Sequence, residues 1–255
     1  MFLSNLKFWA KYYFNIDDLG KGIISKLIFV ILLAAKASIR FLPKKYTDFS
    51  ELIAWFNTVL KTDEVTEEMM RVPLTRENMI FIALSVFVMF FCISVSIFYS
   101  GLVIRHGRKL VSGVKMISIG EYWMRYLIVI FAFAFLYIPF VFAAVYLLLL
   151  FLLAIPFICN AVCSYISGDR GIWDSIAGCS KRLKGKYLLF LRDLSGVYLV
   201  YLIVGFVISL LSYVSSTVYF IVGAALDCWF FLAVARVCAI QYSIGERFTS
   251  GANYT

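Results

Sequence analysis

Three long stretches of this sequence carry no charged side chain, and they constrain its fold more than any other feature. They cover residues 78–104, 126–168 and 194–226 of the 255-residue chain. A helix needs about 20 apolar residues to cross a hydrocarbon core about 30 Å thick, and helices satisfy their own backbone hydrogen bonds in lipid. The sequence therefore predicts an all-α fold, a polytopic integral membrane helical bundle that forms one membrane domain over residues 1–255.

The composition excludes most soluble classes of protein. Hydrophobic residues make up 63% of the chain and charged residues 15%, whereas soluble domains have about 45–50% and about 25%. The one histidine, His106, lies in a basic loop, and the chain contains no phosphate-binding glycine loop. Cys159 and Cys163 have the spacing of metal ligands, but no third ligand is near them in the sequence. We therefore expect no catalytic residues, no cofactor, no metal site and no nucleic-acid binding.

The lengths of the charge-free stretches predict the number of spans. Residues 126–168 would make a single helix of roughly 64 Å, so we expect two helices joined by a tight turn. Residues 194–226 are also too long for one upright span, and Ser215, Ser216 and Thr217 divide them. The six predicted spans are about 23–42, 79–104, 125–144, 147–166, 194–214 and 217–241, with an external loop at 43–78 and cytoplasmic loops at 105–124 and 167–193.

The distribution of cations orients the predicted bundle. Residues 23–42 form the most highly charged of the six segments. The number of Lys and Arg residues on each side of the membrane depends on whether these residues span it. If they do, one side of the membrane holds 17 Lys and Arg residues and the other side holds 7. If they do not, the best arrangement is 13 against 11. The positive-inside rule therefore favours six spans with both termini cytoplasmic, in a prokaryotic inner or plasma membrane.

The external loop contains the pattern of an amphipathic helix. Its apolar residues recur at helical spacing, and Thr47 or Asp48 could cap its first turn. These apolar residues are Phe49, Leu52, Ile53, Phe56, Val59 and Leu60. We expect this short helix to lie on the outer membrane interface, either as a lid over the bundle or as a contact for a partner or substrate.

Asp227 is the most informative single residue, because it lies about ten residues inside the last predicted span. An ionisable group at a depth of about 15 Å is costly in lipid and is often functional. Lys36 lies at a comparable depth in the first span, so we expect an interhelical pair between Lys36 and Asp227. Two alternatives are a protonated Asp227 bonded to a Tyr or Ser, and a proton or ion relay. Asn160 could form a hydrogen bond to another helix.

Two loops on the predicted cytoplasmic side are rich in cations. In the loop at 167–193, the residues Ile172, Ile176, Cys179, Leu183 and Tyr187 share one helical face, and Lys181, Arg182, Lys184 and Lys186 lie beside it. The loop at 105–124 contributes Arg105, Arg108 and Lys109. We expect these seven cations to contact anionic headgroups of the lipid bilayer, at about 1 kcal/mol for each cation near the surface. Alternatively, they only fix the topology.

Residues 167–187 resemble a group of prokaryotic six-span membrane proteins. That group includes the membrane domain attached to some glycerophosphodiester phosphodiesterases and several uncharacterised relatives. The residues that match its short motif are Asp174, Ile176, Ser180, Lys184 and Gly185. The resemblance extends over about residues 79–245 and implies six helices, cytoplasmic termini and no catalytic residues.

Two functions from different classes fit these expectations. The first is a non-catalytic membrane protein that acts by association, as a scaffold, regulator or accessory of an envelope or transport system. The alternative is a transport component, either a small carrier or the permease subunit of an ABC-type exporter that docks a separate ATPase subunit. Carriers usually bury several polar groups near the membrane midplane, whereas Asp227 and Asn160 are nearly alone in these spans.

Overall fold

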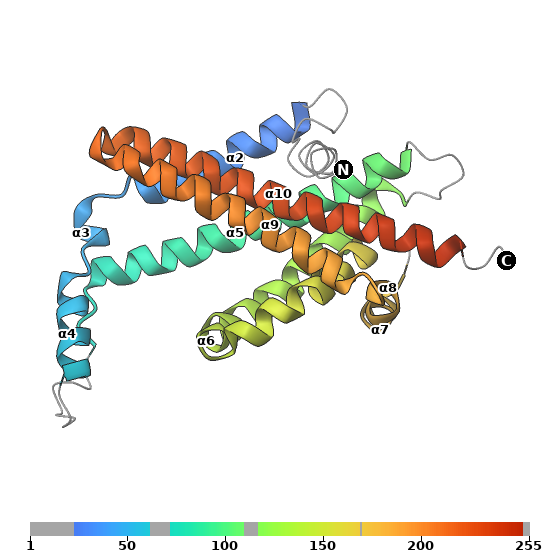
Figure 1. Cartoon of the computed structure of the whole chain (residues 1–255), viewed down its shortest axis with the longest axis horizontal. Helices are drawn as coiled ribbons and strands as arrows, with labels where there is room; N and C mark the ends of the chain where they lie inside the picture. The colour runs from blue at the N-terminus through green and yellow to red at the C-terminus, as the bar shows by residue number, and fades with distance from the viewer. Residues whose placement is uncertain (1–22, 62–71, 110–116, 169, 252–255) are drawn as a thin grey trace.

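The computed structural model describes residues 23–61, 72–109, 117–168 and 170–251, and the regular structure of these residues is entirely helical (Figure 1). The elements are α2 (Ile23–Arg40), α3 (Lys44–Thr47), α4 (Ser50–Lys61), α5 (Arg76–Lys109), α6 (Ile119–Ile166), α7 (Ile172–Ala177), α8 (Cys179–Leu183), α9 (Tyr187–Ser209), the 3-10 helix η2 (Leu210–Tyr213) and α10 (Ser216–Gly251). The predicted all-α fold is therefore confirmed for the described part of the chain.

Helix α10 is the central element of the bundle. It packs against α2, α5 and α9, and these long helices run along the long axis of the molecule (Figure 1). Its buried face is rich in small residues, among them Ala224, Cys228 and Ala235, and small side chains let neighbouring helices approach closely in lipid. The face of α10 toward α2 and α5 packs on buried Leu32, Cys92 and Tyr99. This packing holds together α2, α5 and α10, which line the pocket described below.

Helix α6 folds back on itself, although its backbone is helical throughout Ile119–Ile166. Arg125 Nη1 donates a hydrogen bond to the carbonyl oxygen of Tyr165 at 3.0 Å. In a straight helix these two residues would lie about 60 Å apart, so the chain must reverse between them. Figure 1 shows the two arms side by side, diverging from the rest of the bundle. The chain therefore reverses direction within residues 126–168, as predicted, but the reversal lies within one continuous helical element instead of a separate turn.

Four segments of the described residues are long and apolar enough to cross a membrane. They are Arg76–Arg108, Ile119–Leu136, Tyr187–Tyr213 and Ser216–Ser243, which correspond to the second, third, fifth and sixth predicted spans. Helix α2 covers the first predicted span, but its eighteen residues include three cations. The second arm of α6 contains a shorter apolar helix, Leu153–Ile166. These findings are consistent with a polytopic membrane protein.

The segment predicted as an external loop contains the predicted helix, α4, at the end of the molecule (Figure 1). Asp48 Oδ1 accepts a hydrogen bond from the backbone N–H of Ser50 at 3.0 Å, and hydrogen bonds from Ser50 lower the pKa of Asp48. The buried Asn78 side chain bonds to the carbonyl oxygen of Asp48 at 2.8 Å, which ties the loop to the start of α5. Ile53 and Phe56 are exposed, so α4 does not pack as a lid over the bundle.

Candidate functional site

The candidate site is a cluster of two cations from α2 and a tyrosine from α9 around Asp227 on α10. Arg40 of α2 donates a hydrogen bond from Nη2 to Asp227 Oδ2 at 3.1 Å, and Lys36 Nζ lies 3.9 Å from the same oxygen. Tyr201 of α9 donates a hydrogen bond to Asp227 Oδ1 at 2.8 Å. Lys36 and Arg40 lie one helical turn apart, so both point from the same face of α2. The carboxylate therefore connects α10 with α2 and α9.

The three charged side chains are mostly buried. The exposed fractions are 13% for Asp227, 18% for Lys36 and 25% for Arg40. Each cation also lies over an aromatic ring: Lys36 Nζ is 5.0 Å from the ring centroid of Phe231, and Arg40 Cζ is 5.8 Å from that of Tyr219. Two cations share one carboxylate, so the cluster has a net charge of +1.

Gly223 permits the close approach of Arg40 to α10. A Cβ atom at this position would lie 2.7 Å from Arg40 Nη1, which is closer than real Cβ contacts. Gly223 and Asp227 are four residues apart and share one face of α10. The absence of a side chain at Gly223 therefore makes room for the guanidinium group that pairs with Asp227.

An open, groove-like cavity of about 400 Å³ lies beside the cluster and is lined by residues of α2, α5 and α10. Its lining consists of Lys36, Ile39, Arg40, Ser85, Val86, Met89 and Asp227. Its size falls within the usual range for small-molecule sites, about 300–1,000 Å³. The hydroxyl of Ser85 is buried and has no hydrogen-bond partner among the described residues. We refer to this cavity and its lining as the α2–α5–α10 pocket.

The structure brings Lys36 and Asp227 together, as we expected, but Arg40 is the nearer partner. Arg40 was not singled out from the sequence, because it lies near the end of the first predicted span. The signal in the sequence was its spacing of four residues from Lys36, which places both cations on one face of the helix. The hydrogen bond from Tyr201 to Asp227 matches one alternative in part, since a Tyr does bond to this carboxylate.

Asn160 forms a second buried polar contact, with Arg182. Arg182 Nε donates to Asn160 Oδ1 at 2.6 Å, and Arg182 Nη2 donates to the carbonyl oxygen of Ser175 at 2.6 Å. Arg182 is 4% exposed. The expectation that Arg182 contacts lipid headgroups is therefore corrected: its guanidinium points inward because Asn160 and Ser175 supply acceptors, and it ties α8 to the second arm of α6.

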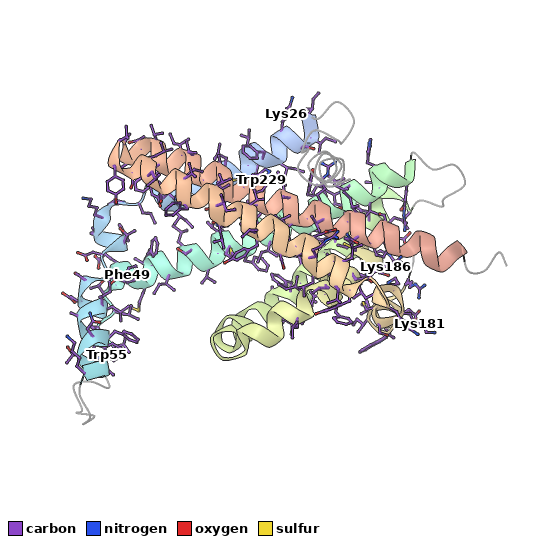
Figure 2. All side chains as sticks on the ribbon, in the orientation of Figure 1. Lys26, Phe49, Trp55, Lys181, Lys186 and Trp229 are labelled. Atoms are coloured by element: carbon purple, nitrogen blue, oxygen red, sulfur yellow. The ribbon has the colours of Figure 1, made fainter. Side chains whose placement is uncertain are left out.

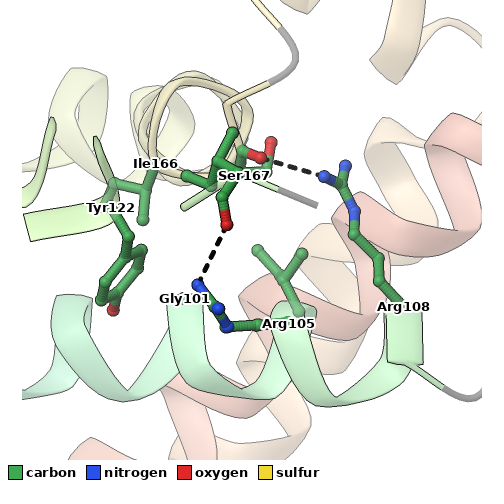
Figure 3. Close-up of a pocket in the computed structure, with 8 residues that line it drawn as sticks. Gly101, Arg105, Arg108, Tyr122, Ile166 and Ser167 are labelled. Atoms are coloured by element: carbon green, nitrogen blue, oxygen red, sulfur yellow. Dashed lines mark hydrogen bonds between the residues drawn. The ribbon is translucent and has the colours of Figure 1, made fainter. Parts of the chain in front are cut away.

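The cations at 105–109 lie at the end of α5, and one of them, Arg108, differs from the expectation. Arg108 is buried and donates to the carbonyl oxygen of Ser167 at 2.9 Å, and Arg105 donates to that of Ile117 at 3.3 Å. Figure 3 shows these bonds beside a cavity of about 20 Å³, which has room for about one water molecule. Arg108 therefore bonds to a backbone carbonyl group in the protein interior and does not face the surface. The side chain of Lys109 lies outside the described residues.

Three expected headgroup contacts remain at or near the surface. Lys181 and Lys184 are exposed, and Lys186 is half-buried, which lowers the pKa of its ammonium group. Figure 2 shows Lys181 and Lys186 beside α7 and α8, whereas Phe49 and Trp55 lie at the opposite end of the molecule. Exposed cations also occur near α4, at Lys44, Lys45 and Lys61, so they do not by themselves distinguish the two ends.

Sequence reasoning missed two further buried charges. Asp193 at the start of α9 is 2% exposed and accepts a hydrogen bond from Gln241 Nε2 of α10 at 2.5 Å. Arg236 is 2% exposed and lies 3.5 Å from the hydroxyl oxygen of Tyr99 on α5. Both contacts join residues far apart in the chain, so no local pattern signals them.

In the described part of the chain, the fold is all-helical, four helices are long and apolar enough to span a membrane, and a cationic cluster lines the α2–α5–α10 pocket. No family model, no curated protein and no solved structure matches this chain. The resemblance of residues 167–187 to the membrane domain of some glycerophosphodiester phosphodiesterases therefore stays a prediction.

Proposed function

We propose that this chain is a non-catalytic membrane protein that acts by association, as a scaffold, regulator or accessory of an envelope or transport system. The observation that carries the proposal is the outer face of the α6 hairpin. The inner side of its first arm packs on α5, where Phe133 stacks on Phe90 with ring centroids 5.7 Å apart. On the outer side, Phe131 and Phe135 are 68% and 70% exposed. Aromatic residues are enriched at protein–protein interfaces.

A photo-crosslinking experiment tests whether a protein covers this face. A benzoylphenylalanine replaces Phe135 on α6 or, as a matched control, Phe206 on α9, which is 71% exposed. Irradiation of intact cells should give a discrete protein adduct at position 135 and only lipid adducts at position 206. Lipid adducts alone at both positions would contradict a role in association.

The alternative function is a transport component, either a small carrier or the permease subunit of an ABC-type exporter. The α2–α5–α10 pocket favours this alternative, because Lys36, Arg40 and Ser85 line it together with Asp227. The sequence alone suggested that Asp227 is nearly isolated, whereas carriers bury several polar groups. A permease subunit would contact an ATPase at its cytoplasmic end, where Trp173 on α7 is 81% exposed. A benzoylphenylalanine at position 173 that crosslinks to an ATP-binding protein would favour the transporter, and the absence of such an adduct would favour the accessory role.

The proposal includes six spans with both termini cytoplasmic, in a prokaryotic inner or plasma membrane. It is supported by α2, which lies along α5 and α10, and by the folded-back α6. In this arrangement Lys181, Lys184 and Lys186 contact anionic headgroups of the inner leaflet.

Cysteine accessibility tests this orientation. Glu51 on α4 and Ser180 on α8 are both exposed and should lie on opposite sides of the membrane. An impermeant maleimide should label Glu51→Cys in intact cells and Ser180→Cys only after permeabilisation. The reverse pattern, or labelling of both in intact cells, would contradict the topology.

A further inference from the structure

The α2–α5–α10 pocket has an excess of positive charge and opens toward the side of the helical bundle. Lys36 and Arg40 face it together with one carboxylate, Asp227. Both oxygens of that carboxylate are already engaged, Oδ1 by Tyr201 and Oδ2 by Arg40. Since an uncompensated charge is costly away from water, the pocket favours a ligand that brings one negative charge.

The polar groups of the pocket that remain available are hydrogen-bond donors. Lys36 Nζ lies 3.9 Å from Asp227 and makes no hydrogen bond to a described residue. Arg40 bonds to Asp227 through Nη2 alone, so its other N–H groups have no acceptor among the described residues. The Ser85 hydroxyl of α5 is buried and unpaired within this part of the chain. An oxyanion with several acceptor oxygens matches such a set of donors.

The remaining wall of the pocket is apolar. Ile39, Val86 and Met89 line it, and Met89 is 41% exposed on the outer surface of α5. A soluble anion would gain nothing from this wall, whereas a lipid could place its phosphate on the donors and its alkyl part against Met89. The pocket therefore suits an amphiphile that enters from the side of the bundle.

We infer that the α2–α5–α10 pocket binds a singly charged phosphate group between Lys36, Arg40 and Ser85, and that a phosphodiester lipid headgroup supplies it. This inference is independent of the partner proposed for α6, since the two surfaces are formed by different helices. The ion pair of Arg40 with Asp227 holds α2 in place, and Lys36 supplies the charge that the ligand neutralises.

Native mass spectrometry of the full chain released from lipid nanodiscs tests the site. Nanodiscs contain either phosphatidylglycerol, which has one negative charge, or zwitterionic phosphatidylcholine. The wild-type chain should retain one phosphatidylglycerol molecule at least about tenfold more often than phosphatidylcholine. Lys36→Met should lower this retention about tenfold, because it removes the cation that makes no hydrogen bond to Asp227 and leaves the Arg40–Asp227 pair intact. Lys26→Met, which removes an exposed cation from the same helix, should change retention less than about twofold.

Two further measurements separate binding from folding and identify the source of the phosphate. Ser85→Ala removes a donor without altering the charge, so it should weaken retention while the melting temperature stays unchanged. Added inorganic phosphate should displace the lipid only if a free anion is the better ligand, which would assign the same site to soluble phosphate. Equal retention of phosphatidylglycerol by wild type, Lys36→Met and Ser85→Ala, with no binding of inorganic phosphate, would overturn the inference.

Discussion

Arg40, rather than Lys36, should contribute most to the stability that Asp227 provides. Arg40 is 3.1 Å from the carboxylate and donates a hydrogen bond, whereas Lys36 is 3.9 Å away, beyond hydrogen-bond distance. A hydrogen bond between charged groups contributes about 1.5–3 kcal/mol. The side chains are 13–25% exposed, so solvent screens the pairs only in part. We therefore expect a coupling free energy of about 2 kcal/mol for Arg40 and about 1 kcal/mol or less for Lys36.

Two double-mutant cycles measure these couplings. One combines Arg40→Met with Asp227→Asn, and the other combines Lys36→Met with Asp227→Asn. Asparagine keeps an acceptor for Tyr201, so the substitution mainly removes charge. The free energy of unfolding comes from SDS titration in mixed micelles, followed by tryptophan fluorescence. A coupling of about 2 kcal/mol corresponds to about a 30-fold change in the folding equilibrium, which this assay resolves.

Gly223 provides an independent way to perturb the same pair. Alanine would place Cβ 2.7 Å from Arg40 Nη1, so Gly223→Ala should displace the guanidinium group and reduce the Arg40–Asp227 coupling. Gly205→Ala is the matched control, because its nearest neighbour, Leu226, would lie 3.7 Å away. Equal couplings for Arg40 and Lys36, or couplings below about 0.5 kcal/mol in both cycles, would refute this reasoning.

Gly101→Ala should destabilise the protein by about 1–3 kcal/mol in the same titration, because its Cβ would lie 2.6 Å from Tyr122 Oη. Gly107→Ala has open space around it and should be neutral or slightly stabilising, so equal losses would contradict the α5–α6 packing. Asn160→Leu should cost about 2 kcal/mol, because it removes the acceptor of buried Arg182 Nε, although the bond from Nη2 to Ser175 remains. Lys181→Leu, at an exposed position, should change stability by less than about 0.5 kcal/mol, and an equal effect of the two would argue against the buried contact. Burial raises the pKa of the Cys179 thiol, so at pH 7.5 maleimide should label it at least about tenfold more slowly than Ser180→Cys, as measured by peptide mass spectrometry. Comparable labelling rates would show that Cys179 is accessible.

Much of the helical framework follows from the sequence, because it depends on length and charge alone. The charge-free stretches predicted α5, α9 and α10, and the 43-residue stretch could only be a hairpin. The pairing of Lys36 with Asp227 could also be predicted from the sequence, because two charges at similar depth in apolar segments have few other partners. Such inferences need no knowledge of which helices are neighbours.

The remaining contacts depend on tertiary structure. Whether a loop cation faces water or the interior depends on acceptors that the fold brings to it, as Asn160 reaches Arg182 across 22 positions of the chain. Asp193 similarly accepts a hydrogen bond from Gln241, which lies 48 positions further along the chain. The role of Arg40 requires both the packing of α2 on α10 and the space left by Gly223.

A density map of the protein in phosphatidylglycerol nanodiscs would test most directly whether the bundle contains a cationic pocket inside the membrane. We expect α2 to cross the bilayer beside α5 and α10, with Asp227 bonded to Arg40 and Tyr201. We also expect density of the size of a phosphate group within hydrogen-bond distance of Lys36 and Arg40. A map with α2 outside the bilayer, or with Lys36 and Arg40 directed away from Asp227, would contradict this arrangement.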